Sequence, residues 1–219
     1  MEHSRLSTWE SAWRVASITL CLVFAVLAIE ITKSPSLFVA LDTWFENMIV
    51  TIRTPLLSHT FIWITHLGSI PFVAGIVAIA GILLVSSRKY WAYVVGFFVT
   101  LSGSVVSGYL LKELIARPRP GGIIPMLAET SGSFPSGHAT IGIALYGFLA
   151  YLLYVLFPTQ RPFIVVGATL LIALIGFSRL YLGVHFPTDV IAGYALGGIW
   201  LIIGVETVRK VSNKIPPSL

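Results

Sequence analysis

The fold of this chain is decided by a stretch in its second half, residues 136–157, whose sequence is SGHATIGIALYGFLAYLLYVLF. After its Ser-Gly-His opening, the stretch is apolar and carries no charge from residue 139 to residue 157. A helix needs about 20 apolar residues to cross the hydrocarbon core of a bilayer. The sequence therefore predicts a membrane-crossing helix over residues 139–157 that begins directly after a polar cluster.

Five further stretches are apolar and long enough to cross a bilayer. They run over residues 13–32, 61–85, 90–114, 163–182 and 190–208. Apolar residues make up 56% of the chain, charged residues make up 11%, and the mean hydropathy is +0.90. This composition is typical of integral membrane proteins. We therefore expect an all-α fold, an integral membrane bundle of six transmembrane helices, in which residues 1–219 form a single membrane-embedded domain.

The first two of these stretches carry local signals of their own. Residues 13–32 follow basic residues, as the core of a secretory signal does, but the stretch is too long for such a core and no small-x-small site ends it. We expect it to be retained as a membrane helix. Pro71 is expected to kink the second stretch, because proline lacks the N–H that an inner helical position donates.

Residues 37–53 are predicted to form a short amphipathic helix between the first two crossings. Apolar side chains recur there at helical spacing, and Pro55 ends the segment. The polar side carries Asp42, Glu46 and Asn47. The segment is too short to span a bilayer, so we expect it to lie in the outer membrane–water interface, as a wall or lid beside the site. The alternative is a buried connecting helix.

The net charge of +5 follows a membrane topology and does not indicate nucleic-acid binding. One group of basic residues lies at the termini or in the second and fourth connections, which share one face of a six-crossing bundle. The group consists of Arg5, Arg14, Arg88, Lys89, Arg161, Arg209, Lys210 and Lys214. The positive-inside rule makes that face cytoplasmic. We expect a multi-pass protein of the cell membrane with both termini in the cytoplasm and the opposite face outward, on the extracellular or periplasmic side.

Three polar clusters fall at predicted helix ends on the outward face. They are Lys112 with Arg119 and Pro120; Pro135, Ser136, Gly137 and His138; and Ser178 with Arg179, His185 and Asp189. Arginine can grip two phosphate oxygens at once, and lysine acts as a point charge. A helix that begins at Ser136 adds free backbone N–H groups, which bind anions. The residues expected to bind a phosphate are Lys112, Arg119, Ser136, Gly137 and Arg179.

His138, His185 and Asp189 supply groups that can break an ester bond. A carboxylate on one ring nitrogen of His185 leaves the other nitrogen bare for attack. We expect His185 to displace the leaving group and form a phosphohistidine, with His138 acting first as acid and then as base. Metal ligation by the same three residues competes on residue types alone, but the surrounding cations disfavour it, so neither a metal nor another cofactor is expected.

The three clusters read Lys-x6-Arg-Pro, Pro-Ser-Gly-His and Ser-Arg-x5-His-x3-Asp, and they resemble the signature of the type 2 phosphatidic acid phosphatase superfamily. That family includes lipid phosphate phosphatases, glucose-6-phosphatase and the vanadium haloperoxidases. The resemblance implies a metal-independent phosphatase with the residue roles given above. The compact chain also resembles small bacterial members of the family, which implies undecaprenyl pyrophosphate or phosphatidylglycerophosphate as the lipid substrate.

Two other functions would use the same anion site. A lipid-phosphate transporter or scramblase would bind the headgroup for passage, but the clusters lie at one face with no polar path to the other. A phosphotransferase would pass the phosphoryl group to an acceptor other than water, and the sequence leaves this alternative open.

Four residues outside the motifs also stand out. Arg117 is expected to be an interfacial or substrate-edge contact. His66, inside the second apolar stretch, is expected to be a packed, hydrogen-bonded histidine, with a role beside the site as the alternative. Gly193 and Gly197 form a small-xxx-small pattern. Close packing within the bundle is the expected reason, a dimer face is the alternative, and the oligomeric state stays open.

Overall fold

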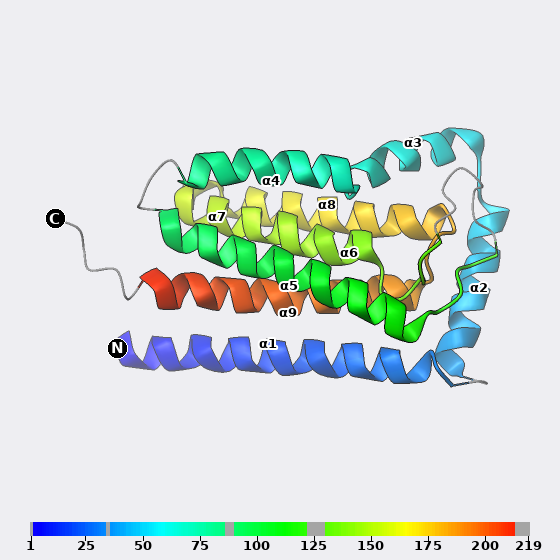
Figure 1. The fold of residues 1–219 in the computed structure, drawn as a ribbon, viewed down its shortest axis with the longest axis horizontal. Helices are drawn as coiled ribbons and strands as arrows, with labels where there is room; N and C mark the ends of the chain where they lie inside the picture. Colours follow the sequence, from blue (N-terminus) through cyan, green and yellow to red (C-terminus); the bar gives the residue numbers. More distant parts are fainter. Residues whose placement is uncertain (1, 34–35, 86–89, 122–129, 213–219) are drawn as a thin grey trace.

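The structure is a computed structural model that describes residues 2–33, 36–85, 90–121 and 130–212, with side chains from residue 11 onward. Long helices run side by side along one axis, and one shorter helix lies across their ends (Figure 1). The elements are α1 (Glu2–Glu30), α2 (Leu37–Thr51), α3 (Pro55–His66), α4 (Ile70–Val85), α5 (Trp91–Ile115), α6 (Gly137–Gly142), the π-helical turn η3 (Ile143–Gly147), α7 (Phe148–Leu156), the 3-10 turn η4 (Pro158–Gln160), α8 (Arg161–Tyr181) and α9 (Pro187–Ser212).

Six helical segments among the described residues are long and apolar enough to cross a membrane. They are Ser11–Glu30, Pro55–Val85, Trp91–Ile115, Gly137–Leu156, Pro158–Tyr181 and Pro187–Ser212. The prediction of six transmembrane helices in an all-α fold is confirmed. The second segment begins earlier than predicted, because Pro55 occupies the first helical turn and the Thr54 hydroxyl accepts a hydrogen bond from Leu57 N–H.

Helix α2 is the short amphipathic helix that the sequence predicts, and it crosses the ends of the spanning helices (Figure 1). The side that faces the bundle carries Asp42 and Ile49, each 1% exposed, whereas Asn47 of the predicted polar side is exposed. Its apolar side faces outward, with Leu37 72% and Trp44 62% exposed. The helix thus covers the end of the bundle and turns a hydrophobic surface away from it.

The second span is divided into α3 and α4 by a break at residues 67–69. Pro71 is the second residue of α4, where the missing N–H costs nothing, so the interruption falls just before the proline rather than around it. The carbonyl of Leu67 accepts a hydrogen bond of 2.6 Å from the Tyr146 hydroxyl, which η3 carries. The π-helical turn therefore ties the fourth span to the break in the second.

Helix α9 is the central helix and packs against α1, α5, α6 and α8. Glycines make this close packing possible. A Cβ at Gly193 would lie 2.6 Å from Ser136 O, and one at Gly197 would lie 2.4 Å from Thr140 O. The prediction that these glycines serve packing within the bundle is confirmed, and their faces are occupied by α6.

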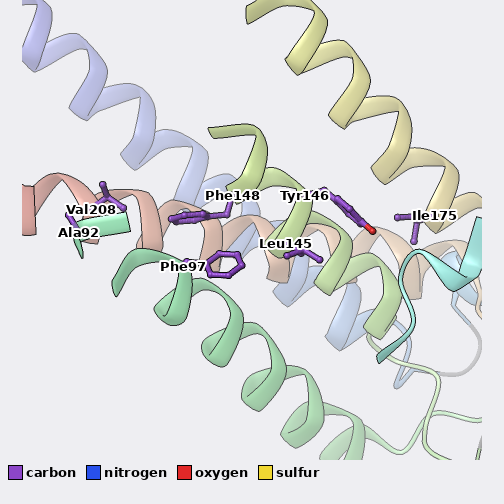
Figure 2. Close-up of a cluster of buried hydrophobic side chains, with 7 residues drawn as sticks. All are labelled: Ala92, Phe97, Leu145, Tyr146, Phe148, Ile175 and Val208. Carbon is purple, nitrogen blue, oxygen red and sulfur yellow. The ribbon is translucent and has the colours of Figure 1, made fainter. Parts of the chain in front are cut away.

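A cluster of buried apolar side chains fills the middle of the bundle (Figure 2). Phe97 of α5 and Phe148 of α7 meet with ring centroids 5.4 Å apart. The other members are Ala92, Leu145, Tyr146, Ile175 and Val208. This core joins α5, η3, α7, α8 and α9 and reaches the polar clusters at Ile175, whose carbonyl accepts from the Ser178 hydroxyl over 2.6 Å.

Candidate active site

The ends of α5 and α8 and the start of α9, which carry residues of the polar clusters, lie toward the end of the bundle that α2 crosses (Figure 1). Ser136 N–H, at the start of α6, donates to Asp189 O at the start of α9, over 2.9 Å. Arg119, from the segment after α5, donates to Val184 O between α8 and α9, over 2.8 Å. Residues far apart in the sequence are therefore joined at this one end.

A sharp turn after α5 places the first cluster. Ala116 adopts a left-handed conformation with φ of 45°, which ends the helix, and its N–H donates to Lys112 O. The chain then pairs with the segment before α6, since Ser133 N–H donates to Arg117 O over 2.8 Å and Ser133 Oγ donates to Pro118 O over 3.0 Å. These bonds fix the backbone just before Arg119 and therefore the direction in which its side chain projects.

The three cations predicted to bind phosphate are held by bonds to the protein. Lys112 Nζ donates to Gly132 O over 2.7 Å, and Arg119 Nε donates to Ser131 O over 3.0 Å. Arg179 is 2% exposed, and its Nη1 donates to the Thr65 hydroxyl over 2.8 Å. The charged groups are therefore fixed in place by the fold.

The start of α6 carries Ser136, Gly137 and His138. Ser136 is fully buried, and its Oγ has no hydrogen-bond partner among the described residues. A Cβ at Gly137 would lie 3.9 Å from Lys112 Cε, which places the lysine stem beside the helix start. The His138 ring packs against the break in the second span, where a Cβ at Gly68 would come within 2.7 Å of His138 Cδ2.

His185 and Asp189 lie together at the start of α9, as the four-residue spacing predicts. His185 Nδ1 is 3.5 Å from Asp189 Oδ2, and Arg119 Nη1 is 3.4 Å from His185 Nε2. Arginine can only donate, so Nε2 is the nitrogen that accepts, and Nδ1 carries the proton toward the carboxylate. In this tautomer Nε2 carries the lone pair, which accepts from Arg119.

The electrostatic environment keeps His185 uncharged. Burial lowers the pKa of His185 to about 4; the hydrogen bond and charge of Asp189 oppose this shift, and Arg179 and Lys112 add to it. An imidazole that stays neutral at pH 7 retains the lone pair that a nucleophile needs.

Arg117 was predicted to be an interfacial or substrate-edge contact, and this prediction is wrong. The side chain is 8% exposed and bridges two carboxylates, with Nη1 2.5 Å from Asp189 Oδ1 and Nη2 2.7 Å from Asp42 Oδ2. Burial requires its charge to be paired, and the two aspartates supply the partners. Asp42 was missed as well, since its place on the polar side of an amphipathic helix suggested exposure to water.

His66 is not packed inside the bundle, contrary to the prediction. Its side chain is exposed and its ring stands edge-on to Trp63, with centroids 6.0 Å apart. The neighbouring Thr65 is the residue of this turn that reaches the site, through Arg179. The hydroxyl of Thr65, directly before His66 in the sequence, is the local signal that could have identified the residue of this turn that contacts the site.

A narrow pocket opens beside His185 under α2. It is lined by Phe45, Glu46, Arg53, Pro120, Leu180, Gly183, His185, Phe186 and Pro187. Its volume of about 10 Å³ is near that of one water-sized sphere. In addition, no group of three or more His, Cys, Asp or Glu side chains with the geometry of a metal site occurs in the part of the chain that the structure describes.

Comparison with known proteins agrees with this architecture. The sequence profile of the PAP2 superfamily matches residues 89–212, which contain all three polar clusters. Phosphatidylglycerophosphatase B from Bacillus subtilis (strain 168) is 34% identical over 203 residues, which cover 90% of this chain and 98% of that protein.

Two solved structures share the fold. One is the crystal structure of a transmembrane PAP2 type phosphatidylglycerolphosphate phosphatase from Bacillus subtilis, with a TM-score of 0.79 and 32% identity over 93% of this chain and 98% of that one. The other is Aquifex aeolicus LpxE, with a TM-score of 0.58 and 27% identity over 80% of this chain and 98% of that one. The chain therefore belongs to the PAP2 superfamily.

Proposed function

We propose that this protein is a lipid phosphate phosphatase whose substrate is phosphatidylglycerophosphate, with undecaprenyl pyrophosphate as the second candidate. The observation that carries the proposal is His185, whose unprotonated Nε2 lies 3.4 Å from Arg119 Nη1 while Asp189 lies beside its other nitrogen. The similarity to phosphatidylglycerophosphatase B supports the choice of first substrate.

The reaction runs in two displacements at phosphorus. His185 Nε2 attacks the phosphorus, the ester P–O bond breaks, and His138 gives a proton to the leaving oxygen, which forms a phosphohistidine. A water molecule that loses its proton to His138 then attacks the phosphorus. The P–N bond breaks, and inorganic phosphate leaves with His185 restored.

The phosphate-binding groups stabilise the charge that develops in each step. Lys112, Arg119 and Arg179 provide cations fixed by the fold, so no reorganisation is needed when charge builds up on the equatorial oxygens. The buried Ser136 hydroxyl, which has no partner among the described residues, is suited to a phosphate oxygen. Asp189 is paired with Arg117, and the phosphate-binding side chains that carry charge are cations. This arrangement supports a reaction that proceeds without a metal ion.

An apolar groove between α4 and α5 supports a lipid substrate. Its volume is about 530 Å³, and Val73, Val77, Phe97 and Phe98 are among its lining residues. Ile141 of α6 also lines it, three residues after His138. We propose that an acyl or prenyl chain occupies this groove, with the headgroup at the cations.

The same proposal covers topology and organisation. The basic residues at the chain ends and in the second and fourth connections support cytoplasmic termini and an outward-facing site at the membrane–water interface, with α2 in that interface. Some of these residues, including Arg88 and Lys89, lie outside the described part. Because α2, α5, α6, α8 and α9 all contribute to the site, the chain works as a single membrane-embedded domain.

The test is phosphate release by the detergent-purified protein in EDTA. The panel consists of phosphatidylglycerophosphate, undecaprenyl pyrophosphate, phosphatidic acid and a soluble phosphate ester. We expect release from the lipids by the wild type, none by His185→Ala, and unchanged release by His59→Ala, whose exposed ring lies outside the site. Release that survives in His185→Ala, or that EDTA abolishes, would overturn the mechanism.

Passage of a non-hydrolysable lipid analogue across liposome membranes without any hydrolysis would favour the transporter. Phosphoryl transfer to an added alcohol in place of water would favour the phosphotransferase.

A further inference from the structure

A cluster of buried charges lies behind the candidate nucleophile, outside the phosphate-binding cations. Asp42 and Asp189 are 1% and 0% exposed, and Arg117 lies between them at 8%. Thr188 closes the cluster, because its N–H donates to Asp42 Oδ1 over 3.1 Å and its hydroxyl accepts from Arg117 Nη1 over 2.8 Å. The ring of Phe186 covers the guanidinium at 4.4 Å.

The cluster determines the orientation of Asp189. Its Oδ1 accepts from Arg117, its Oδ2 accepts from Phe186 N–H over 2.9 Å, and the same Oδ2 faces His185 Nδ1 at 3.5 Å. The carboxylate is thus held from two sides, with Oδ2 next to the imidazole. Asp42 in turn holds the far side of the Arg117 guanidinium, so the fork cannot rotate away from Asp189.

We propose that Asp42 and Arg117 are positioning residues for His185, through which the amphipathic helix α2 becomes part of the support of the nucleophile. The inference rests on the proposed role of His185. Nothing in the three sequence motifs contains Asp42, and the helix that carries it exposes its opposite side. The Asp42–Arg117 ion pair connects α2 to the guanidinium that holds Asp189.

The net charge of the cluster makes the proposal testable by pH. Asp42, Arg117 and Asp189 together carry a charge of −1 beside His185. Asp42→Asn leaves 0, Arg117→Gln leaves −2, and the double variant returns to −1. The other charged or titratable groups that act on His185 are Arg119, Arg179, Lys112 and His138, and none of these changes in the series.

The experiment measures kcat, KM and the pH profile of kcat/KM with phosphatidylglycerophosphate in detergent. For Asp42→Asn we expect kcat to fall about 10- to 100-fold, by analogy with the residues that orient metal-binding histidines, with KM close to the wild-type value. The acid limb should move to lower pH in Asp42→Asn, to higher pH in Arg117→Gln, and back near the wild-type position in the double variant. Arg117→Gln leaves two carboxylates unpaired and could fail to fold. In that case Asp42→Asn and the double variant still test the expected order of the acid limbs.

The controls separate this inference from the proposed function. Glu206→Gln breaks an ion pair with Arg209 elsewhere on α9 and should leave all three quantities unchanged. A wild-type protein that releases no phosphate, or an active His185→Ala, would overturn the proposed function itself. If those two behave as expected but Asp42→Asn keeps the wild-type kcat and acid limb, only the positioning role is wrong. The positioning role is also wrong if kcat falls only in proportion to the melting temperature of each variant while the acid limb stays at its wild-type pH.

Discussion

At the scale of single residues, the site is built from groups that the fold has already immobilised. Arg179 is an example, because its Nη1 bonds the Thr65 hydroxyl across from α3. His185 is another, because burial and its neighbours keep it neutral while Arg119 and Asp189 face its two ring nitrogens. The nearby cations and the burial act in the same direction, because both disfavour a protonated imidazole.

The lowered pKa of His185 can be tested directly. The folded value of about 4 lies below the ordinary 6.5, so the unfolded chain binds more protons between these two values. The contribution of His185 to the free energy of unfolding is therefore fully present above pH 6.5 and is lost as the pH falls through about 4. In an NMR titration of histidine-labelled protein, assigned with His185→Ala, the His185 signal should stay that of a neutral ring down to about pH 5. A midpoint near 6.5 would contradict this assignment.

At the scale of elements, the sequence predicts the helices well because hydrophobic length and proline positions are local signals. The three motifs also predict which residues meet, since helix ends on one face of a bundle lie close together. Asp42 and Arg117 could not be paired in this way. Their contact depends on how α2 lies across the bundle, which no local pattern encodes. The contact of the π-helical turn with the second span, through Tyr146 and Leu67, likewise joins segments that no local pattern pairs.

Two adjacent glycines of α9 offer a matched test of packing. A Cβ at Gly197 would lie 2.4 Å from the backbone oxygen of Thr140, whereas one at Gly198 would lie 3.0 Å from a terminal methyl of Leu20, which can turn aside. We expect Gly197→Ala to destabilise the protein by about 1–3 kcal/mol, as overpacking does, and to lower kcat by displacing α6. Gly198→Ala should change both much less. The measurements are thermal unfolding in detergent and phosphate release, and equal effects of the two variants would contradict the packing account.

At the scale of the whole molecule, the bundle separates two ends of different character. One end carries the polar clusters under α2, and the opposite end of α9 carries Arg209 and Lys210 in its last turn. The proposed orientation follows from this asymmetry and can be tested in intact cells.

Cys21 is the only cysteine of the chain, so a Cys21→Ser background allows single labels. On that background, a membrane-impermeant maleimide should label Thr43→Cys on α2 and should not label Thr159→Cys in the fourth connection until the cells are opened. Both positions are exposed, so accessibility within the protein is matched. The reverse pattern would invert the topology and leave the chemistry untouched.

The contact between Asp42 and Thr188 also has a consequence for biosynthesis. Asp42 leaves the ribosome early, Arg117 follows near the midpoint of the chain, and Thr188 emerges only with the last helix. A lone carboxylate is costly to bury, so α2 keeps its polar side in water until its late-synthesised partners have entered the bilayer. The contact between α2 and the start of α9 therefore forms only after the last helix has been made, and a chain interrupted before its sixth helix lacks this contact and Asp189 of the third polar cluster.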